Sequence, residues 1–120
     1  MHVPALSLIA LVAIEHLYFM YLEMFAWTRN RTRRAFGTTA EFAEASKSLA
    51  ANQGLYNGFL AAGLVWSLVH PDPLIARQLQ VFFLACVIVA AIYGGITVKR
   101  SILLIQGLPA ALALALVSLR

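Results

Sequence analysis

Four long apolar segments, joined by short polar ones, dominate the pattern of the chain. Each is long enough for one membrane crossing, since a transmembrane helix needs about 20 predominantly apolar residues. The pattern therefore predicts an all-α membrane protein, a four-transmembrane-helix bundle that forms a single domain over residues 1–120. The predicted helices cover residues 4–27, 39–69 (apolar from 49), 75–98 and 101–119.

Local signals mark where these helices begin and end. Pro4 suits a first helical turn, and residues 38–41 (TTAE) have the spacing of a capping box, which predicts a helix start. Residues 70–73 (HPDP) predict a tight turn. Pro109 is expected to bend the last helix and to free a carbonyl near Gln106.

Composition then settles the class of protein. Hydrophobic residues make up 62% of the chain and charged residues 12%, and the mean hydropathy is +0.82, which is too apolar for a soluble surface. We expect the first helix to be retained, because Glu15 and Glu23 interrupt it and no basic residues precede it, unlike a signal peptide. The single cysteine, Cys86, is expected to serve packing.

Basic residues gather in two connecting segments. Four arginines lie within residues 29–34, and Lys99 and Arg100 separate the last two helices. By the positive-inside rule both segments face the cytoplasm, which puts both termini outside a bacterial inner (plasma) membrane. We interpret the arginines as a topological signal in contact with anionic lipid, and expect no nucleic-acid partner.

Ionisable residues inside the first helix are the leading candidates for a functional site. Glu15 and His16 fall near the membrane midplane, and Glu23 lies roughly 11 Å toward the cytoplasm at about 1.5 Å per residue. An ionised carboxylate at the midplane costs at least about 2.5–3.5 kcal/mol, so Glu15 should face protein or trapped water and favour its neutral form.

Polar residues of the other helices share the cytoplasmic half, while the exterior half is nearly all aliphatic. This asymmetry predicts a polar cavity that is open to the cytoplasm and closed outward. With Glu15, His16 and Glu23, its predicted lining is Asn52, Gln53, Tyr56, Asn57, Tyr93 and Gln106.

The second helix also carries a pair of glycines. Gly54 and Gly58 have the spacing that lets two membrane helices approach closely. Angular arithmetic puts them on the side opposite the amides, and we interpret them as packing residues.

Simpler interpretations remain for each site residue. The amides and tyrosines could only bond between helices, and Glu23 could extend to the interface or pair with an arginine. Glu15, His16 and Glu23 lack a paired His or Cys spacing, so we expect no metal and no cofactor.

Several blocks resemble a known family. Glu15–His16 with residues 21–25, then residues 52–58, 92–95 and 106–110, are similar to the bacterial membrane proteins called domain of unknown function 1304 (DUF1304) over essentially the whole chain. The resemblance implies four membrane spans. It implies no function, because the family has no established activity.

Three functions remain open. The first is a carrier in which Glu15 binds a proton or a cationic or polar solute. The second is a membrane enzyme in which Glu15 and His16 act as acid and base on a lipid-soluble substrate, oriented by Tyr93, Asn52 and Asn57. The third is a scaffold. We favour the carrier, since there is one midplane carboxylate and no nucleophile constellation. The expected partners are the bilayer, an unknown small molecule and a second copy of the chain.

Overall fold

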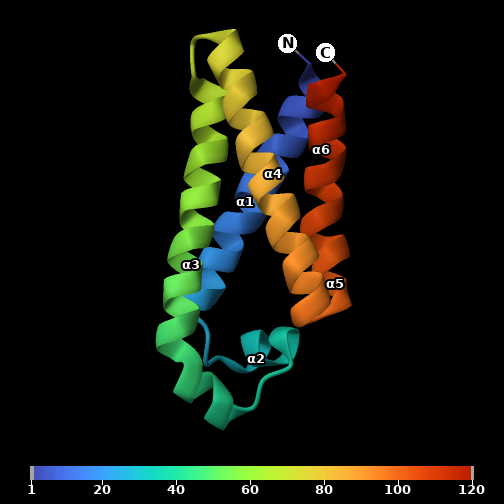
Figure 1. Ribbon diagram of the computed structural model, residues 1–120. Coiled ribbons are helices and arrows are strands. Elements are labelled where there is room, and N and C mark those ends of the chain that lie inside the picture. The colour runs from blue at the N-terminus through green and yellow to red at the C-terminus, as the bar shows by residue number, and fades with distance from the viewer. Residues whose placement is uncertain (1, 120) are drawn as a thin grey trace. The chain divides into compact units, whose positions relative to one another are not determined.

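The computed structural model describes residues 2–119, and these form helices almost throughout (Figure 1). No strand occurs within this range, so the predicted all-helical fold is confirmed. The elements are α1 (Val3–Phe25), α2 (Asn30–Phe36), α3 (Ala40–Val69), α4 (Pro73–Thr97), α5 (Arg100–Ile102), a π-helical segment η1 (Leu103–Gly107) and α6 (Leu108–Ser118).

Three stretches of residues 2–119 are long and apolar enough to cross a membrane: Val3–Phe25, Pro73–Thr97 and Arg100–Ser118. The described chain therefore has the helices that a membrane protein needs. α3, at 30 residues, is long enough as well, but the amides between its residues 52 and 57 lower its hydropathy. The bundle of four spans and the side on which the termini lie thus remain predictions.

The chain divides into two compact units. The terminal unit comprises Met1–Ile14 and Leu60–Arg120, and the central unit comprises Glu15–Phe59, so α1 and α3 contribute to both.

The terminal unit contains an apolar core, and α4 and α6 lie side by side in it (Figure 1). Gly63 is needed on α3, because a Cβ there would lie 2.3 Å from the ring of Phe83. The core combines alanines with larger aliphatic side chains, and small residues let helices pack closely. Its buried members are Ala5, Ile9, Val12, Ala13, Leu64, Leu84, Val87, Ala110, Ala113 and Val117.

The helix starts follow the predicted signals with two differences. α4 begins at Pro73 and not at residue 75, because Asp72 caps it by accepting a hydrogen bond from the backbone N–H of Leu74 at 2.9 Å. α3 begins at Ala40, and its cap is Thr39 rather than Thr38: the Thr39 hydroxyl accepts from the N–H of Phe42 at 3.1 Å.

The short helix α2 was not predicted within the basic segment. It ends at Gly37, whose left-handed conformation (φ 69°) suits glycine, and the rings of Trp27 and Phe36 pack with centroids 4.9 Å apart. Arginine-rich sequence carries no apolar periodicity, so Gly37 was the local signal in the sequence for the end of a helix.

A π-helical segment, η1, lies just before Pro109, and the bend and the free carbonyl expected there stay predictions. Proline has no N–H and clashes with the carbonyl four residues earlier, here that of Ile105. The wider π-turns of Leu103–Gly107 immediately precede it. Gly107 brings this segment close to α4, since a Cβ there would lie 3.2 Å from that of Ala91.

Candidate functional site

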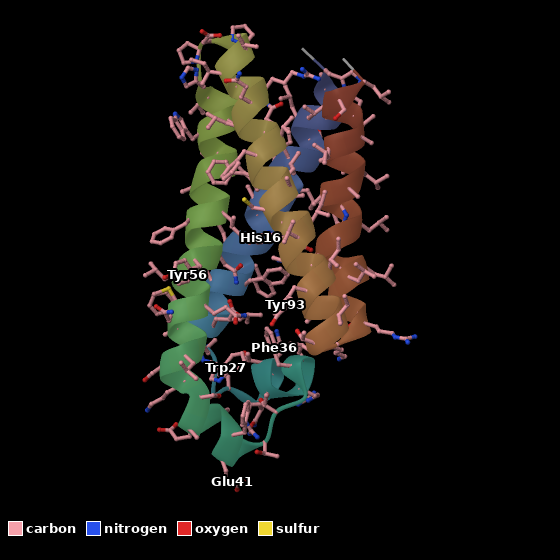
Figure 2. The ribbon with its side chains drawn as sticks, in the orientation of Figure 1. His16, Trp27, Phe36, Glu41, Tyr56 and Tyr93 are labelled. Carbon is pink, nitrogen blue, oxygen red and sulfur yellow. The ribbon has the colours of Figure 1, made fainter. Side chains whose placement is uncertain are left out.

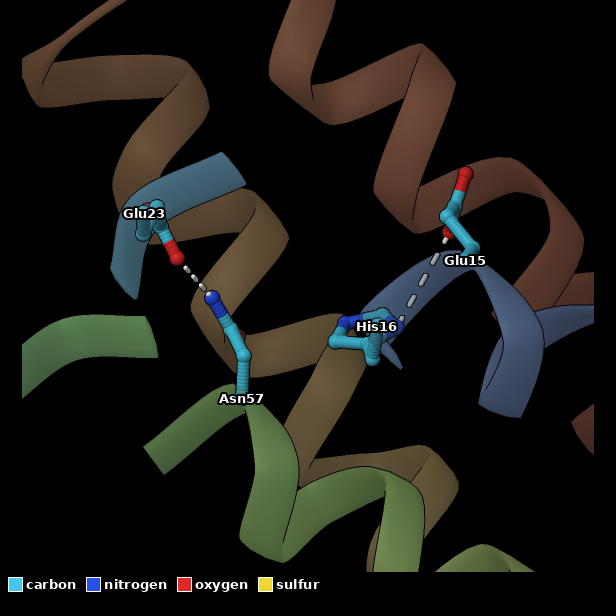
Figure 3. A network of polar contacts seen from close by, with 4 residues as sticks. All are labelled: Glu15, His16, Glu23 and Asn57. Atoms are coloured by element: carbon cyan, nitrogen blue, oxygen red, sulfur yellow. Dashed lines mark hydrogen bonds and ion pairs between the residues drawn. The ribbon is translucent and has the colours of Figure 1, made fainter. Parts of the chain in front are cut away.

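Glu23 is the most enclosed acid of the central unit, with 2% of its surface exposed. Its two carboxyl oxygens each accept one hydrogen bond from α3: Gln53 Nε2 donates to Oε2 at 2.6 Å and Asn57 Nδ2 donates to Oε1 at 2.6 Å. Figure 3 shows the contact with Asn57. Residues four apart share a helix face, which is why one carboxylate receives both amides.

Glycines let α3 approach α1 at this point. A Cβ on Gly54 would lie 2.8 Å from Cγ of Met24 and 3.2 Å from the carbonyl oxygen of Met20, and one on Gly58 would lie 2.8 Å from Sδ of Met20. Short amide side chains reach a carboxylate on another helix only when the two backbones are close. The glycines therefore build the Glu23 site as well as the helix packing.

This arrangement corrects one sequence inference. We expected Gly54 and Gly58 on the side of the helix opposite the amides, but both sets face α1. At about 100° per residue, Asn57 falls about 40° and Gly54 about 100° from Gln53, so they fit within one side. Angles within a helix do not tell which side meets its neighbour.

Glu23 also does not extend to solvent. It is buried, and among residues 2–119 no lysine or arginine forms an ion pair with it. Lys47 Nζ does form an ion pair in the central unit, but with Oε1 of Glu44 at 2.6 Å, and both side chains are exposed. Amide donors thus stabilise the Glu23 carboxylate in place of a counter-ion.

Glu15 has a different environment. Its side chain is 19% exposed, and its Oε1 is buried without a hydrogen-bond partner among residues 2–119. His16 Nδ1 lies 4.0 Å from that oxygen, too far for a hydrogen bond (Figure 3). His16 is fully buried and packs edge-on against the ring of Phe19, with centroids 5.3 Å apart.

Other predicted site residues stay outside these contacts. Tyr56 is 59% exposed, and its ring packs against that of Phe59 with centroids 5.7 Å apart. Asn52 is exposed as well. Figure 2 shows Tyr56 and His16 on their separate helices. Tyr93, which is 70% exposed, and the half-buried Gln106 belong to the terminal unit.

Two cavities of the described residues are not lined by the predicted site residues. One, of about 440 Å³, lies in the central unit beside Arg33, Arg34 and Thr38. The other, of about 590 Å³, lies in the terminal unit beside Gln80 and Ser67. Within residues 2–119, no three His, Cys, Asp or Glu side chains are grouped as metal ligands would be.

Sequence reasoning missed two sets of polar contacts. Trp27 Nε1 donates to Ser46 Oγ at 3.1 Å, which joins the end of α1 to α3. Gln80 and Ser67 are buried polar residues in the half of the helices that we expected to be aliphatic. Two glutamines, Gln78 and Gln80, follow Pro73 within two turns and were the available signal for the second set.

Comparison with known proteins agrees with the resemblance found in the sequence. Residues 10–118 match the family Protein of unknown function (DUF1304). The chain is 37% identical over 118 residues to the Uncharacterized protein YpaA of Lactococcus lactis subsp. lactis (strain IL1403), an alignment that covers 95% of this chain and 96% of that protein. No solved structure matches the chain significantly. The resemblance is thus confirmed, and this chain belongs to the DUF1304 family.

Proposed function

We propose that this chain is a multi-pass protein of the bacterial inner membrane that carries a small cationic or polar solute across the bilayer in exchange for protons at Glu15. In this proposal all four long helical segments cross the membrane. The arginines of residues 29–34 and the Lys99–Arg100 pair face the cytoplasm, in accordance with the positive-inside rule.

One observation carries the proposal: the buried Oε1 of Glu15 has no hydrogen-bond partner among residues 2–119. A buried polar atom without a partner costs about 1–3 kcal/mol, so such atoms are few; the others among the described residues, Thr38 Oγ1 and Gln80 Oε1, are not on carboxyl groups. A carboxyl oxygen in this position can hold a proton, which removes the charge, or accept from a cationic or hydrogen-bonding solute. The carboxyl group cannot hold a proton and bind the solute at the same time. This competition couples the transport of the solute to the movement of protons.

Glu23 has a different role in this proposal. Both of its oxygens are occupied by Gln53 and Asn57. A solute could bind there only by breaking two hydrogen bonds. Glu23 therefore holds α1 against α3 and positions Glu15, while Glu15 itself exchanges the ligand.

An enzyme is the second candidate, and one observation favours it. Glu15 Oε1 and His16 Nδ1 lie 4.0 Å apart, close enough to exchange a proton after a small movement. His16 is fully buried, however, so a substrate would reach Glu15 and not the imidazole. A carrier needs only the carboxyl group, and for this reason we prefer it.

Transport by reconstituted protein tests the proposal. The full chain would be reconstituted into vesicles of phosphatidylethanolamine and phosphatidylglycerol that have an acidic interior. Radiolabelled methyl viologen, a water-soluble organic cation, would then be added outside. We expect accumulation that collapses with the pH gradient and is abolished by Glu15→Gln. Glu41→Gln, at an exposed acid of the first turn of α3, is the matched control and should transport normally. Uptake that is unaffected by Glu15→Gln, or equal to that of empty vesicles, would contradict the carrier.

A further inference from the structure

A cleft with a mostly apolar wall and a few polar side chains lies in the terminal unit, where the chain turns from α3 into α4. Its volume is about 590 Å³, within the usual size of a small-molecule site. The start of α1, the end of α3 and the first turns of α4 line it. Leu6 and Leu68 make part of its wall apolar. None of its residues takes part in the proposed carrier site.

Gln80 gives this cleft an unused acceptor. It is 3% exposed, and its Nε2 donates to the backbone oxygen of Ser67 at 3.5 Å. Its Oε1 is buried and has no hydrogen-bond partner among the described residues. A buried amide oxygen requires an N–H or O–H donor, and a ligand in the cleft can supply one.

Arg77 gives the same cleft a cation. Its Nε donates to the backbone oxygen of Val117 at 3.4 Å, which holds the side chain in place. A guanidinium has five N–H donors, so this contact leaves donors for a ligand. Guanidinium groups bind phosphate and carboxylate through paired hydrogen bonds.

Two imidazoles add neutral donors. His70 Nδ1 accepts from the backbone N–H of Asp72 at 3.0 Å, and His2 Nδ1 accepts from that of Ala5 at 3.2 Å. A neutral imidazole with Nδ1 as acceptor carries its proton on Nε2, where it can donate. Asp72 is not among the described residues that line the cleft, although its neighbours Pro71 and Pro73 are.

The order of these groups along α4 restricts the ligand further. Arg77 lies one turn after the start of the helix, and Gln80 lies one turn deeper, about 4.5 Å along the axis. Because α4 is apolar enough to cross a membrane, this order runs from the surface inward. A matching ligand has an anionic group, then a hydroxyl, then a hydrocarbon chain.

We propose that this cleft binds a single-chain phospholipid, with its phosphate on Arg77 and its free glycerol hydroxyl donating to Oε1 of Gln80. A phospholipid with two acyl chains has this hydroxyl esterified and offers no proton there. The unpaired amide oxygen thus selects the single-chain lipid over the bulk lipid of the bilayer.

The proposal can be tested by measuring, with thermophoresis, how tightly four probes bind to the full chain in maltoside micelles. The probes are oleoyl lysophosphatidic acid, its 2-deoxy analogue, dioleoyl phosphatidic acid and glycerol 3-phosphate. We expect the first to bind about fivefold more tightly than the second and third, which corresponds to one hydrogen bond. Equal affinity for the 2-deoxy analogue overturns the role of Gln80. Equal affinity for glycerol 3-phosphate overturns the lipid assignment in favour of a free phosphate ester.

Variants of Arg77 and Gln80 test the proposed contacts with the phosphate and with the glycerol hydroxyl separately. Arg77→Gln should weaken lysophosphatidic acid binding about tenfold, whereas Arg100→Gln, at an exposed arginine of the same unit, should not. Gln80→Met should bind the lipid and its 2-deoxy analogue equally. If Gln80→Met does not fold, the difference in affinity of the natural chain for lysophosphatidic acid and its 2-deoxy analogue still tests the role of Gln80. An unchanged affinity in Arg77→Gln overturns the proposal.

Discussion

Glu23 and Glu15 are acids of the same helix, eight residues apart, and hydrogen bonding distinguishes them. Glu23 is the more buried, yet both of its oxygens are bound by amides of α3. Glu15 is the more exposed, yet it keeps a buried oxygen without a partner within residues 2–119. Burial alone would select Glu23 as the functional acid. The oxygen of Glu15 that lacks a partner is the reason why we propose Glu15 as the functional acid instead.

The largest expected effect comes from filling the space that lets α3 reach Glu23. Gly54→Leu would put side-chain atoms into Met24, Glu23 and the backbone oxygen of Met20, and backbone cannot move as a flexible side chain can. We expect a loss of about 3 kcal/mol or more in the free energy of unfolding, seen as a fall in the yield of monodisperse protein.

Gly58→Ala provides the matched control for that substitution. Its new methyl group would meet only the side chain of Met20, which is flexible. This variant should retain most of the yield. Equal losses in Gly54→Leu and Gly58→Ala would show that the approach of the two helices is not centred on Glu23.

Removing each acid in turn should produce the next largest difference. Glu23→Ala leaves the amides of Gln53 and Asn57 without their acceptor, and we expect it to cost about 2–3 kcal/mol. Glu15→Ala removes an acid that has no hydrogen bond on Oε1 and should cost less than about 0.5 kcal/mol. Thermal unfolding in detergent, followed by circular dichroism, measures both. A larger loss of stability in Glu15→Ala than in Glu23→Ala would contradict the distinction between the two acids.

These helices could largely be predicted from the sequence, but their contacts could not. Long apolar runs sufficed for α1 and α4, because a span of that length has few alternatives in a membrane. The side of α3 that meets α1 could not be derived from spacing, which is why Gly54 was expected on a different side of the helix from Gln53. The cleft at Gln80 depends on α1, α3 and α4 coming together, which no local pattern encodes.

A smaller effect is expected at the end of α1, beyond Glu23. Trp27→Phe removes the hydrogen bond to Ser46 Oγ but keeps a ring to pack against Phe36. We expect a loss of about 1 kcal/mol. Ser46→Ala removes the same bond and also the one that Ser46 Oγ donates to the backbone oxygen of Phe42 at 2.6 Å, so it should lose at least as much. The double variant should lose little more than Ser46→Ala alone, since both substitutions remove the bond between the two side chains. Fully additive losses would mean that the two side chains stabilise the unit independently.

Labelling of the two acids with dicyclohexylcarbodiimide tests the central distinction most directly. This hydrophobic reagent adds to protonated carboxyl groups in apolar surroundings, and peptide mass spectrometry locates the resulting N-acylurea. We predict an adduct on Glu15, slowed by methyl viologen and absent in Glu15→Gln, with Glu23 unmodified in the same sample. An adduct on Glu23 with Glu15 untouched would contradict the assignment of Glu15 as the exchangeable acid.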